Sequence, residues 1–309
     1  MSLQGQCAVG ISHYLKEIGR GKQGARSLDR DRAADLFGQV LDGTASDLEM
    51  GAFCLAMRIK GETPEEMAGF LDATYARLNL IPASGKPVVV LPSYNGARKL
   101  PVLTPLLALL IARRGLPVLI HGTATESSRV FVPHVLPALG LHPLAGVRVI
   151  APGEAAYVPT ELLCPGLKRL LDVRLVIGLR NSSHSLVKLM NPCAGPAVVV
   201  SSYTHAEYAA SMASVFELMG STALLLRGTE GEVVADARRL PQMDGFIAGR
   251  RIVLEEGRKG TLTELPDLPR DIGAETTAAY IQDVLAGSKP VPASMALQVE
   301  HILRLAESL

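Results

Sequence analysis

Residues 88–122 read VVVLPSYNGARKLPVLTPLLALLIARRGLPVLIHG, and this stretch decides the fold class. Its first five residues are apolar and rich in valine, which is typical of a short buried strand. We expect Thr104 to cap a following helix through its hydroxyl, and Gly115 to end that helix. Val118–Ile120 then has the pattern of a second buried strand. A strand–loop–helix–strand unit of this kind predicts a parallel sheet.

The loop after the first strand lies where parallel sheets bind their ligands, at the carboxyl end of the strand. A loop that cradles phosphate through backbone N–H groups is glycine-rich, yet this loop has one glycine, Gly96, followed by Arg98 and Lys99. Side-chain cations therefore stand where a backbone cradle is expected. This favours a surface that contacts several phosphates over a pocket that holds one pyrophosphate. Solvated loop cations without a ligand are the alternative interpretation of this pair.

The composition excludes several classes of protein. No apolar run approaches the ~20 residues that a membrane helix requires. The N-terminus lacks a basic start followed by a long apolar stretch, so we expect no signal peptide. Cys7, Cys54, Cys164 and Cys193 form no CxxC pair. This spacing predicts reduced thiols in a cytoplasmic protein, with neither a disulfide nor a metal site.

The net charge is +1, but the cations are concentrated in two segments. Residues 86–129 hold six Lys and Arg against one acid, and residues 164–190 hold five against one, so the rest of the chain carries −8. Two basic segments on an acidic body predict an anion-binding face if the fold brings them together. Chance clustering in the sequence, with the cations scattered in space, is the alternative.

The chain before residue 81 contains helical patterns and no strand pattern. We expect helices at Val9–Ile18 and at Leu28–Leu41, the second capped by Ser27. Ser46 with Glu49 and Thr63 with Glu66 have the spacing of capping boxes, which predicts two further helices. Residues 1–80 are therefore predicted to form a helical domain, completed by helices from about 162–192.

From residue 81 to residue 309, strand and helix patterns alternate. This alternation predicts an α/β domain with a central, mostly parallel sheet. Thr204 with Glu207 predicts another capping box, and Asn181 is the expected cap of a helix at Ser182–Met190. The remaining expected elements are strands at Val147–Ile150, Val198–Ser201 and Ala223–Arg227, a hairpin around Phe246–Glu255, and closing helices at Glu275–Ala286 and Ser294–Ala306.

Several motifs together resemble the anthranilate phosphoribosyltransferase family of glycosyltransferase family 3, and within it the YbiB-like branch. They are KEIGRGKQGARSLDRD, MRIKGE, PSYNGARK, RNSSHSLVKLMNP, RGTEGEV and ETTAAYIQDVLAGS, and they cover nearly the whole chain. The resemblance implies a helical N-terminal domain beside a larger α/β domain, and a homodimer joined through the helical domains. The branch implies a nucleic-acid-binding protein in place of an enzyme.

The departures from the enzyme's motifs point the same way. The family's GTGGD segment, which binds ribose pyrophosphate, matches residues 94–98, where Arg98 replaces an aspartate. Its KHGNR segment matches residues 120–124, which read IHGTA. Its adjacent Asp-Glu pair, which holds magnesium, matches the region of Glu230 and Glu232, where a glycine separates the two carboxylates. A pyrophosphate–magnesium complex needs a backbone cradle and paired carboxylates, so we expect no catalytic residues, no cofactor and no metal.

We therefore predict a non-sequence-specific nucleic-acid-binding protein, in which arginine and lysine contact the phosphate backbone of single-stranded DNA or RNA. Tyr94 and Tyr203 are candidates to stack a base each, with core or rim packing as their alternative role. Arg180, His184 and Lys188 follow one another at steps of four, which predicts one shared side of a turn and helix. The predicted contact residues are Arg98, Lys99, Lys168, Arg169, Arg174, Arg180, His184 and Lys188.

Two alternatives stay open from the residues alone. In one, the protein is a phosphoribosyltransferase acting on an unidentified acceptor, with Glu230 and Glu232 on magnesium. In the other, the cations only stabilise contacts within the protein or its dimer. Arg180 bracing a hinge and His184 as a structural histidine belong to this second alternative.

Overall fold

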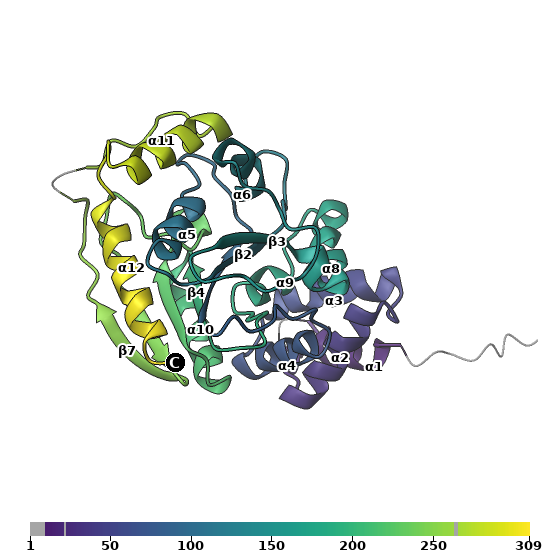
Figure 1. Ribbon diagram of the computed structural model, residues 1–309. Coiled ribbons are helices and arrows are strands. Elements are labelled where there is room, and N and C mark those ends of the chain that lie inside the picture. Colours follow the sequence, from purple (N-terminus) through teal and green to yellow (C-terminus); the bar gives the residue numbers. More distant parts are fainter. Residues whose placement is uncertain (1–9, 22, 263–264) are drawn as a thin grey trace, which may run out of the picture. The chain divides into compact units, whose positions relative to one another are not determined.

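The computed structural model describes residues 10–21, 23–262 and 265–309, which divide into two compact units. The helical unit comprises the described residues up to Leu78 together with Cys164–Leu186. The α/β unit comprises Asn79–Leu163 and Val187–Leu309. The predicted fold class is confirmed: Figure 1 shows helices alone in the early part of the chain and a sheet flanked by helices in the rest. Val9 and Cys7 lie outside the described residues.

The helical unit is built from two stretches of chain. The first supplies four helices and the second supplies two. In chain order the elements are α1 (Ser12–Ile18), α2 (Arg30–Asp42), α3 (Asp47–Lys60), α4 (Pro64–Tyr75), α8 (Pro165–Ile177) and α9 (Ser183–Leu186).

Local capping signals fix two of these helices. The predicted capping boxes at Ser46 with Glu49 and at Thr63 with Glu66 are confirmed, each with both reciprocal hydrogen bonds. The predicted cap at Ser27 is wrong: Asp29 caps α2, because its carboxylate accepts a 2.9 Å bond from the Arg32 N–H. Aspartate and serine are comparable N-cap residues, so the local sequence does not distinguish Asp29 from Ser27 as the cap of this helix.

Aromatic rings and a glycine hold α2 against α4. The rings of Phe37 and Phe70 stack with centroids 4.5 Å apart, and Phe53 meets both edge-on. Gly69 allows this approach, because a Cβ at that position would overlap the carbonyl oxygen of Arg30. The core of this unit is therefore assembled from sequence positions that the helical periodicity places on one face.

The α/β unit contains one seven-stranded sheet in the order β3-β2-β1-β4-β5-β6-β7. The first five strands in this order are parallel, and β6 and β7 add an antiparallel hairpin. The predicted hairpin and the strands near Val88, Val118, Val198 and Ala223 are confirmed. Their bounds are β1 (Val88–Ser93), β2 (Val118–Gly122), β3 (Ala155–Pro159), β4 (Ala197–Tyr203), β5 (Ala223–Arg227), β6 (Met243–Ile247) and β7 (Arg250–Glu255).

Helices cover both faces of the sheet. Val89 and Leu91 of β1 and Val198 and Val200 of β4 share one core with the helices α5 and α12. On the other face α10 packs against β4, β5 and β7, with Phe216 5.3 Å from Phe246 between ring centroids. The helices and turns of this unit are α5 (Thr104–Ala112), α6 (Val132–Val135), η1 (Leu136–Leu139), α7 (Thr160–Leu163), α10 (Ala206–Leu218), η2 (Thr229–Gly231), α11 (Ala274–Ala286) and α12 (Ala293–Ala306).

Two predicted elements and one predicted capping box are wrong. Val147–Ile150 is not a strand; the strand lies at β3, and Val149 is 46% exposed, so only Ile150 of that run is core. The helix predicted at Ser182–Met190 is only α9, so Arg180, His184 and Lys188 do not follow one continuous helix. The box predicted at Thr204 does not form, because α10 begins after His205 and has no side-chain cap.

None of the helices in the described ranges has the length and apolar character needed to cross a membrane.

Candidate functional site

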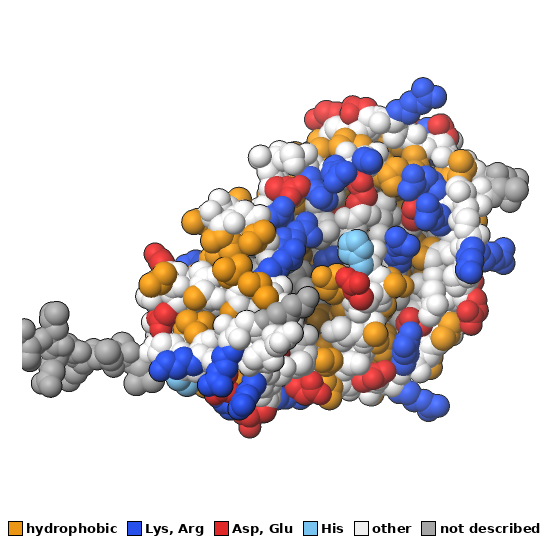
Figure 2. Space-filling view, turned by 180° about the vertical axis from the view of Figure 1, so that it is seen from behind, with side chains coloured by type: hydrophobic (Ala, Val, Ile, Leu, Met, Phe, Trp, Pro, Cys, Tyr) orange, Lys and Arg blue, Asp and Glu red, His pale blue; other side chains and the backbone are white. Residues whose placement is uncertain are grey.

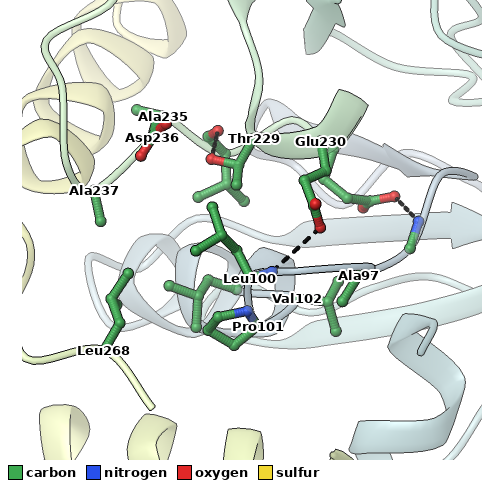
Figure 3. A pocket seen from close by; sticks show the side chains of 14 residues that line it. Ala97, Leu100, Pro101, Val102, Thr229, Glu230, Ala235, Asp236, Ala237 and Leu268 are labelled. Atoms are coloured by element: carbon green, nitrogen blue, oxygen red, sulfur yellow. Dashed lines mark hydrogen bonds between the residues drawn. The ribbon is translucent and has the colours of Figure 1, made fainter. Parts of the chain in front are cut away.

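Two loops meet at the carboxyl edge of the parallel strands in the α/β unit. The first, residues 94–103, follows β1, and the second, residues 228–242, follows β5. Only β4 separates β1 from β5, and all three strands are parallel, so both loops leave the same edge of the sheet. This edge is where ligands of open α/β sheets bind. Figure 3 shows the close approach, with Glu230 reaching from the second loop toward the backbone at Leu100 in the first.

The buried carboxylate of Glu232 fastens the two loops together. Its Oε1 accepts 2.8 Å bonds from the backbone N–H groups of Asn95 and Gly96, and its Oε2 accepts bonds from the hydroxyls of Ser93 at 2.6 Å and Thr104 at 2.9 Å. Glu232 is 3% exposed, so all four donors satisfy a charge that burial would otherwise make costly.

This contact overturns the predicted cap at Thr104. Leu103 is the residue that precedes α5, and no side chain caps that helix. The Thr104 hydroxyl donates instead to a carboxylate 128 positions away along the chain. A bond of such range leaves no trace in local sequence.

The carboxylate of Glu230 binds the next part of the first loop. Its Oε2 accepts from the backbone N–H groups of Arg98 at 2.7 Å, Lys99 at 3.1 Å and Leu100 at 3.4 Å. Five N–H groups between residues 95 and 100 thus bind the chain's own two carboxylates, and the N–H of Ala97 binds the Val130 carbonyl.

A magnesium–ribose pyrophosphate complex does not fit this arrangement. The N–H groups that would surround a pyrophosphate, and the two carboxylates that would hold magnesium, already bind each other. The pocket between the loops has a volume of about 20 Å³, whereas small-molecule sites typically measure about 300–1,000 Å³. Among the described residues there is also no group of three or more His, Cys, Asp or Glu arranged to hold a metal.

His121, at the position of the family's KHGNR histidine, is a core residue. Its side chain is fully buried, and its Nδ1 lies 2.8 Å from the hydroxyl of Tyr94, which in turn lies 2.9 Å from the Thr160 hydroxyl. Burial lowers the pKa of His121 to about 3, so the imidazole is neutral at physiological pH. Tyr94 is 3% exposed, which makes packing and hydrogen bonding its role in place of base stacking.

A larger and strongly basic cleft lies beside the Glu230 contact. It measures about 710 Å³ and is formed within the α/β unit by the ends of β4 and β5, the loop 236–242 and the turn 257–260. Two acids, Glu230 and Asp236, line it with six cations, and we call it the basic cleft. The six cations are Lys99, Arg227, Arg238, Arg239, Arg258 and Lys259.

Most of these cations are available to an anion. Arg238 forms a 2.9 Å ion pair with Asp236. The other five have exposed side chains that form no hydrogen bond or ion pair with another residue in the described ranges. Figure 2 shows many Lys and Arg side chains on the face it draws. Tyr203 also lines the cleft, half-buried, and its burial raises the pKa of the phenol, so the ring carries no charge.

The predicted contact residues fall into both units. In the α/β unit, Arg98 and Lys99 are exposed, and Lys99 lines the basic cleft. Lys188 is half-buried and donates from Nζ to the carbonyl oxygens of Gly231 at 2.8 Å and Ser202 at 3.4 Å. Its ammonium therefore supports the loop that carries Glu230 and Glu232.

The other five predicted residues belong to the helical unit. Lys168 pairs with Asp172 at 2.5 Å, and Arg169 donates to the carbonyl oxygen of Leu41 at 2.8 Å, so both contribute to packing around α8. His184 is buried, and its Nδ1 accepts a 3.3 Å bond from the Asn181 N–H. Arg174 and Arg180 are half-buried.

Sequence reasoning missed the cations at Arg227, Arg238, Arg239, Arg258 and Lys259. Residues 227–259 hold seven cations and six acids, so a regional charge sum is almost zero. Arg227 is the last residue of the predicted strand Ala223–Arg227, and Arg258 and Lys259 come soon after the predicted hairpin, so a position at a strand end was the available signal for these three. Arg238 and Arg239 lie inside the long loop after β5, where that signal is absent. Two acids of this region do not lie in the cleft beside its cations, because Glu232 is buried and Asp244 forms an ion pair with Arg251.

The comparisons with known proteins agree with this fold. Residues 12–77 match the glycosyl transferase family, helical bundle domain. The chain is 42% identical over 292 residues to the uncharacterized protein YbiB of Escherichia coli K12, which covers 92% of this chain and 91% of YbiB. It is 28% identical to the anthranilate phosphoribosyltransferase of Xanthobacter autotrophicus, over 85% of this chain and 74% of the enzyme.

A solved structure supports the same conclusion. The anthranilate phosphoribosyltransferase of Thermus thermophilus superimposes with a TM-score of 0.69 at 22% identity, over 96% of this chain and 94% of the enzyme. At that identity the likeness is one of fold. The chain belongs to the YbiB family, and its fold is that of the anthranilate phosphoribosyltransferases.

Proposed function

We propose that this protein binds nucleic acid without sequence preference, through contacts of its cations with the phosphate backbone of single-stranded DNA or RNA. The observation that carries the proposal is the basic cleft, because six cations against two acids line one concave surface. Guanidinium groups bind phosphate oxygens in bidentate geometry, and lysine adds a mobile point charge. The single tyrosine ring in the cleft supplies little stacking surface, so backbone charge is the main source of affinity.

The contacts of the two loops favour binding over catalysis. Glu230 and Glu232 occupy the N–H groups that a phosphoribosyltransferase needs for its donor substrate. A transferase with magnesium on these glutamates would require breaking at least six hydrogen bonds within the site.

Within the proposal, the predicted cations keep separate roles. Lys99 lines the basic cleft, the neighbouring exposed Arg98 adds a cation beside it, and Lys188 supports the loop that carries Glu230. Among the predicted residues of the helical unit, Arg174 and Arg180 are the candidates for phosphate contact. Lys168, Arg169 and His184 act there through packing.

We also propose a homodimer joined through the helical unit, in the cytoplasm. The support for the dimer is an apolar groove of about 330 Å³, lined by residues of α1 and α3 that include Leu15, Ala52, Leu55 and Ile59. Leu55 and Ile59 are 47% and 57% exposed, and an exposed apolar patch of this kind marks an interaction surface. Cys54, Cys164 and Cys193 are buried free thiols, as suits a reducing compartment.

The test of the function is polarisation binding of a labelled random-sequence single strand at several salt concentrations. We expect log affinity to fall linearly with log salt, and ribose pyrophosphate with magnesium to leave the binding unchanged. The variant Arg239→Ala/Lys259→Ala should flatten the slope by about 0.7 for each phosphate that is no longer neutralised. Arg250→Ala/Arg304→Ala is the matched control, because it removes two exposed cations outside the cleft.

Absence of binding at low salt would refute the proposal. An equal loss of affinity in the two double variants would show that net charge alone attracts the strand. The basic cleft would then not be the binding site.

A further inference from the structure

The contact between Glu230 and the first loop has the geometry of a bound anion. Three successive backbone N–H groups, of Arg98, Lys99 and Leu100, converge on one carboxylate at 2.7 to 3.4 Å. Successive N–H groups that point to one place form an anion-binding concavity, known as a nest. Here the anion is a side chain of the same protein, and Figure 3 shows it reaching across to the loop.

The nest opens toward the basic cleft. Glu230, Lys99 and Leu100 line the cleft as well as forming this contact, and Arg238 and Arg239 lie on the same surface. A phosphate that entered the cleft would therefore find, beyond the cations, a set of N–H donors held by a carboxylate. Carboxylate and phosphate oxygens accept the same hydrogen bonds, so the two groups compete for one position.

Glu230 is held less firmly than Glu232. Glu232 is 3% exposed and is also bound by two hydroxyls, whereas Glu230 is only partly buried and is bound by the N–H groups alone. Its backbone has φ 53° and ψ 19°, in the left-handed region, which is strained for a non-glycine residue. A strained residue whose side chain borders solvent is the part of this site that can move.

We propose that the nest of Arg98, Lys99 and Leu100 is a phosphate-binding subsite of the basic cleft, and that Glu230 closes it as an internal mimic of phosphate. A phosphate of the nucleic-acid backbone displaces the Glu230 carboxylate into solvent and takes over its N–H donors. This inference rests on the proposed function. It adds three N–H donors that become available only when a phosphate displaces the carboxylate.

The test compares two variants that remove the same charge from the same cleft. Glu230→Ala opens the nest, whereas Asp236→Asn leaves Glu230 in place. Losing one negative charge raises the affinity for a single strand in both variants. Opening the nest adds charge-assisted hydrogen bonds, so we expect Glu230→Ala to bind a random single strand on the order of tenfold more tightly than Asp236→Asn.

A second measurement reads the nest directly. In ¹⁵N-labelled protein, millimolar inorganic phosphate should shift the amide resonances of Arg98, Lys99 and Leu100 in Glu230→Ala and leave them in place in Asp236→Asn. Glu230→Gly, which relieves the backbone strain, should behave like Glu230→Ala. A result confined to Glu230→Gly would assign the effect to loop conformation and overturn the proposal.

The two proposals fail in different ways. If the wild type binds single strands but the two variants gain equally and the amides stay in place, the subsite is refuted and the function stands. If phosphate shifts the three amides in Glu230→Ala but no variant binds a strand, the subsite stands and the nucleic-acid function is refuted.

Discussion

The carboxylate of Glu232 accepts a 2.6 Å hydrogen bond from the hydroxyl of Ser93, which joins the loop after β5 to the last residue of β1. The two residues are 139 positions apart, and both are buried. The bond closes the carboxyl edge of the sheet from within, because one buried carboxylate joins both loops.

Removing that charge is expected to destabilise the α/β unit. Glu232→Ala leaves two hydroxyls and two backbone N–H groups without an acceptor, and should lower the free energy of unfolding by at least about 3 kcal/mol. Glu232→Gln retains one acceptor oxygen and should cost less. Urea unfolding measures both, with Glu256→Gln as the control, since Glu256 is exposed. A stable Glu232→Ala would mean that water replaces the carboxylate.

The buried imidazole of His121 predicts a pH dependence of stability. Its pKa is about 3 in the folded protein, against about 6.5 in an unfolded chain. Above pH 6.5 the residue is neutral in both states and has no effect. As the pH falls below 6.5 only the unfolded chain takes up the proton, so stability falls by about 1.4 kcal/mol per pH unit.

The measurement is the free energy of unfolding between pH 6.5 and pH 5. The wild type should lose about 2 kcal/mol more over this range than His121→Gln. His142→Gln removes an exposed histidine and should keep the wild-type slope. Parallel curves for wild type and His121→Gln would show that His121 becomes protonated within the fold.

Substitutions of Lys99 and Lys188 should distinguish a cation that contacts phosphate from one that stabilises the loop after β5. Lys99→Met removes an exposed cation of the basic cleft, so the salt slope should fall by about 0.7 with little change in stability. Lys188→Met removes the donor to the carbonyls of Gly231 and Ser202, and should cost about 1–2 kcal/mol of stability with the slope unchanged. Thermal unfolding and polarisation binding of both variants decide the point. A reduced slope in Lys188→Met would make its ammonium a phosphate contact.

The apolar groove of the helical unit predicts the oligomeric state. Ile59→Asp places a charge on the exposed face of α3, where burial against a second copy would carry a large desolvation cost. We expect light scattering to give a dimer for the wild type and a monomer for Ile59→Asp. Leu265→Asp is the control, because Leu265 is 59% exposed in the α/β unit. A monomeric wild type would refute the dimer.

Features decided by neighbouring residues were predictable from the sequence. The boxes at Ser46 with Glu49 and Thr63 with Glu66 depend on three-residue spacings, and the buried valine runs mark the parallel strands. The helix predicted at Ser182–Met190 was too long, since only Ser183–Leu186 is helical. The cap at Thr104 was not predictable, because its hydroxyl donates to Glu232, 128 positions away along the chain. The basic cleft was hidden for the same reason: its lining comes from separate segments whose charges nearly cancel along the chain.

The composition of the helical unit also limits the order in which the chain can fold during synthesis. Its last two helices come from Cys164–Leu186, so α2 lacks its partner α8 until the ribosome has passed the first three strands of the sheet. Gly166 then packs directly against the carbonyl of Leu41, a contact in which any Cβ would overlap the backbone. The nascent chain therefore emerges with an uncovered helical surface and an unfinished sheet at the same time. The helical unit becomes complete only after Leu186 has been made, and the α/β unit only after the segment Val187–Leu309, so neither unit can finish folding early in synthesis.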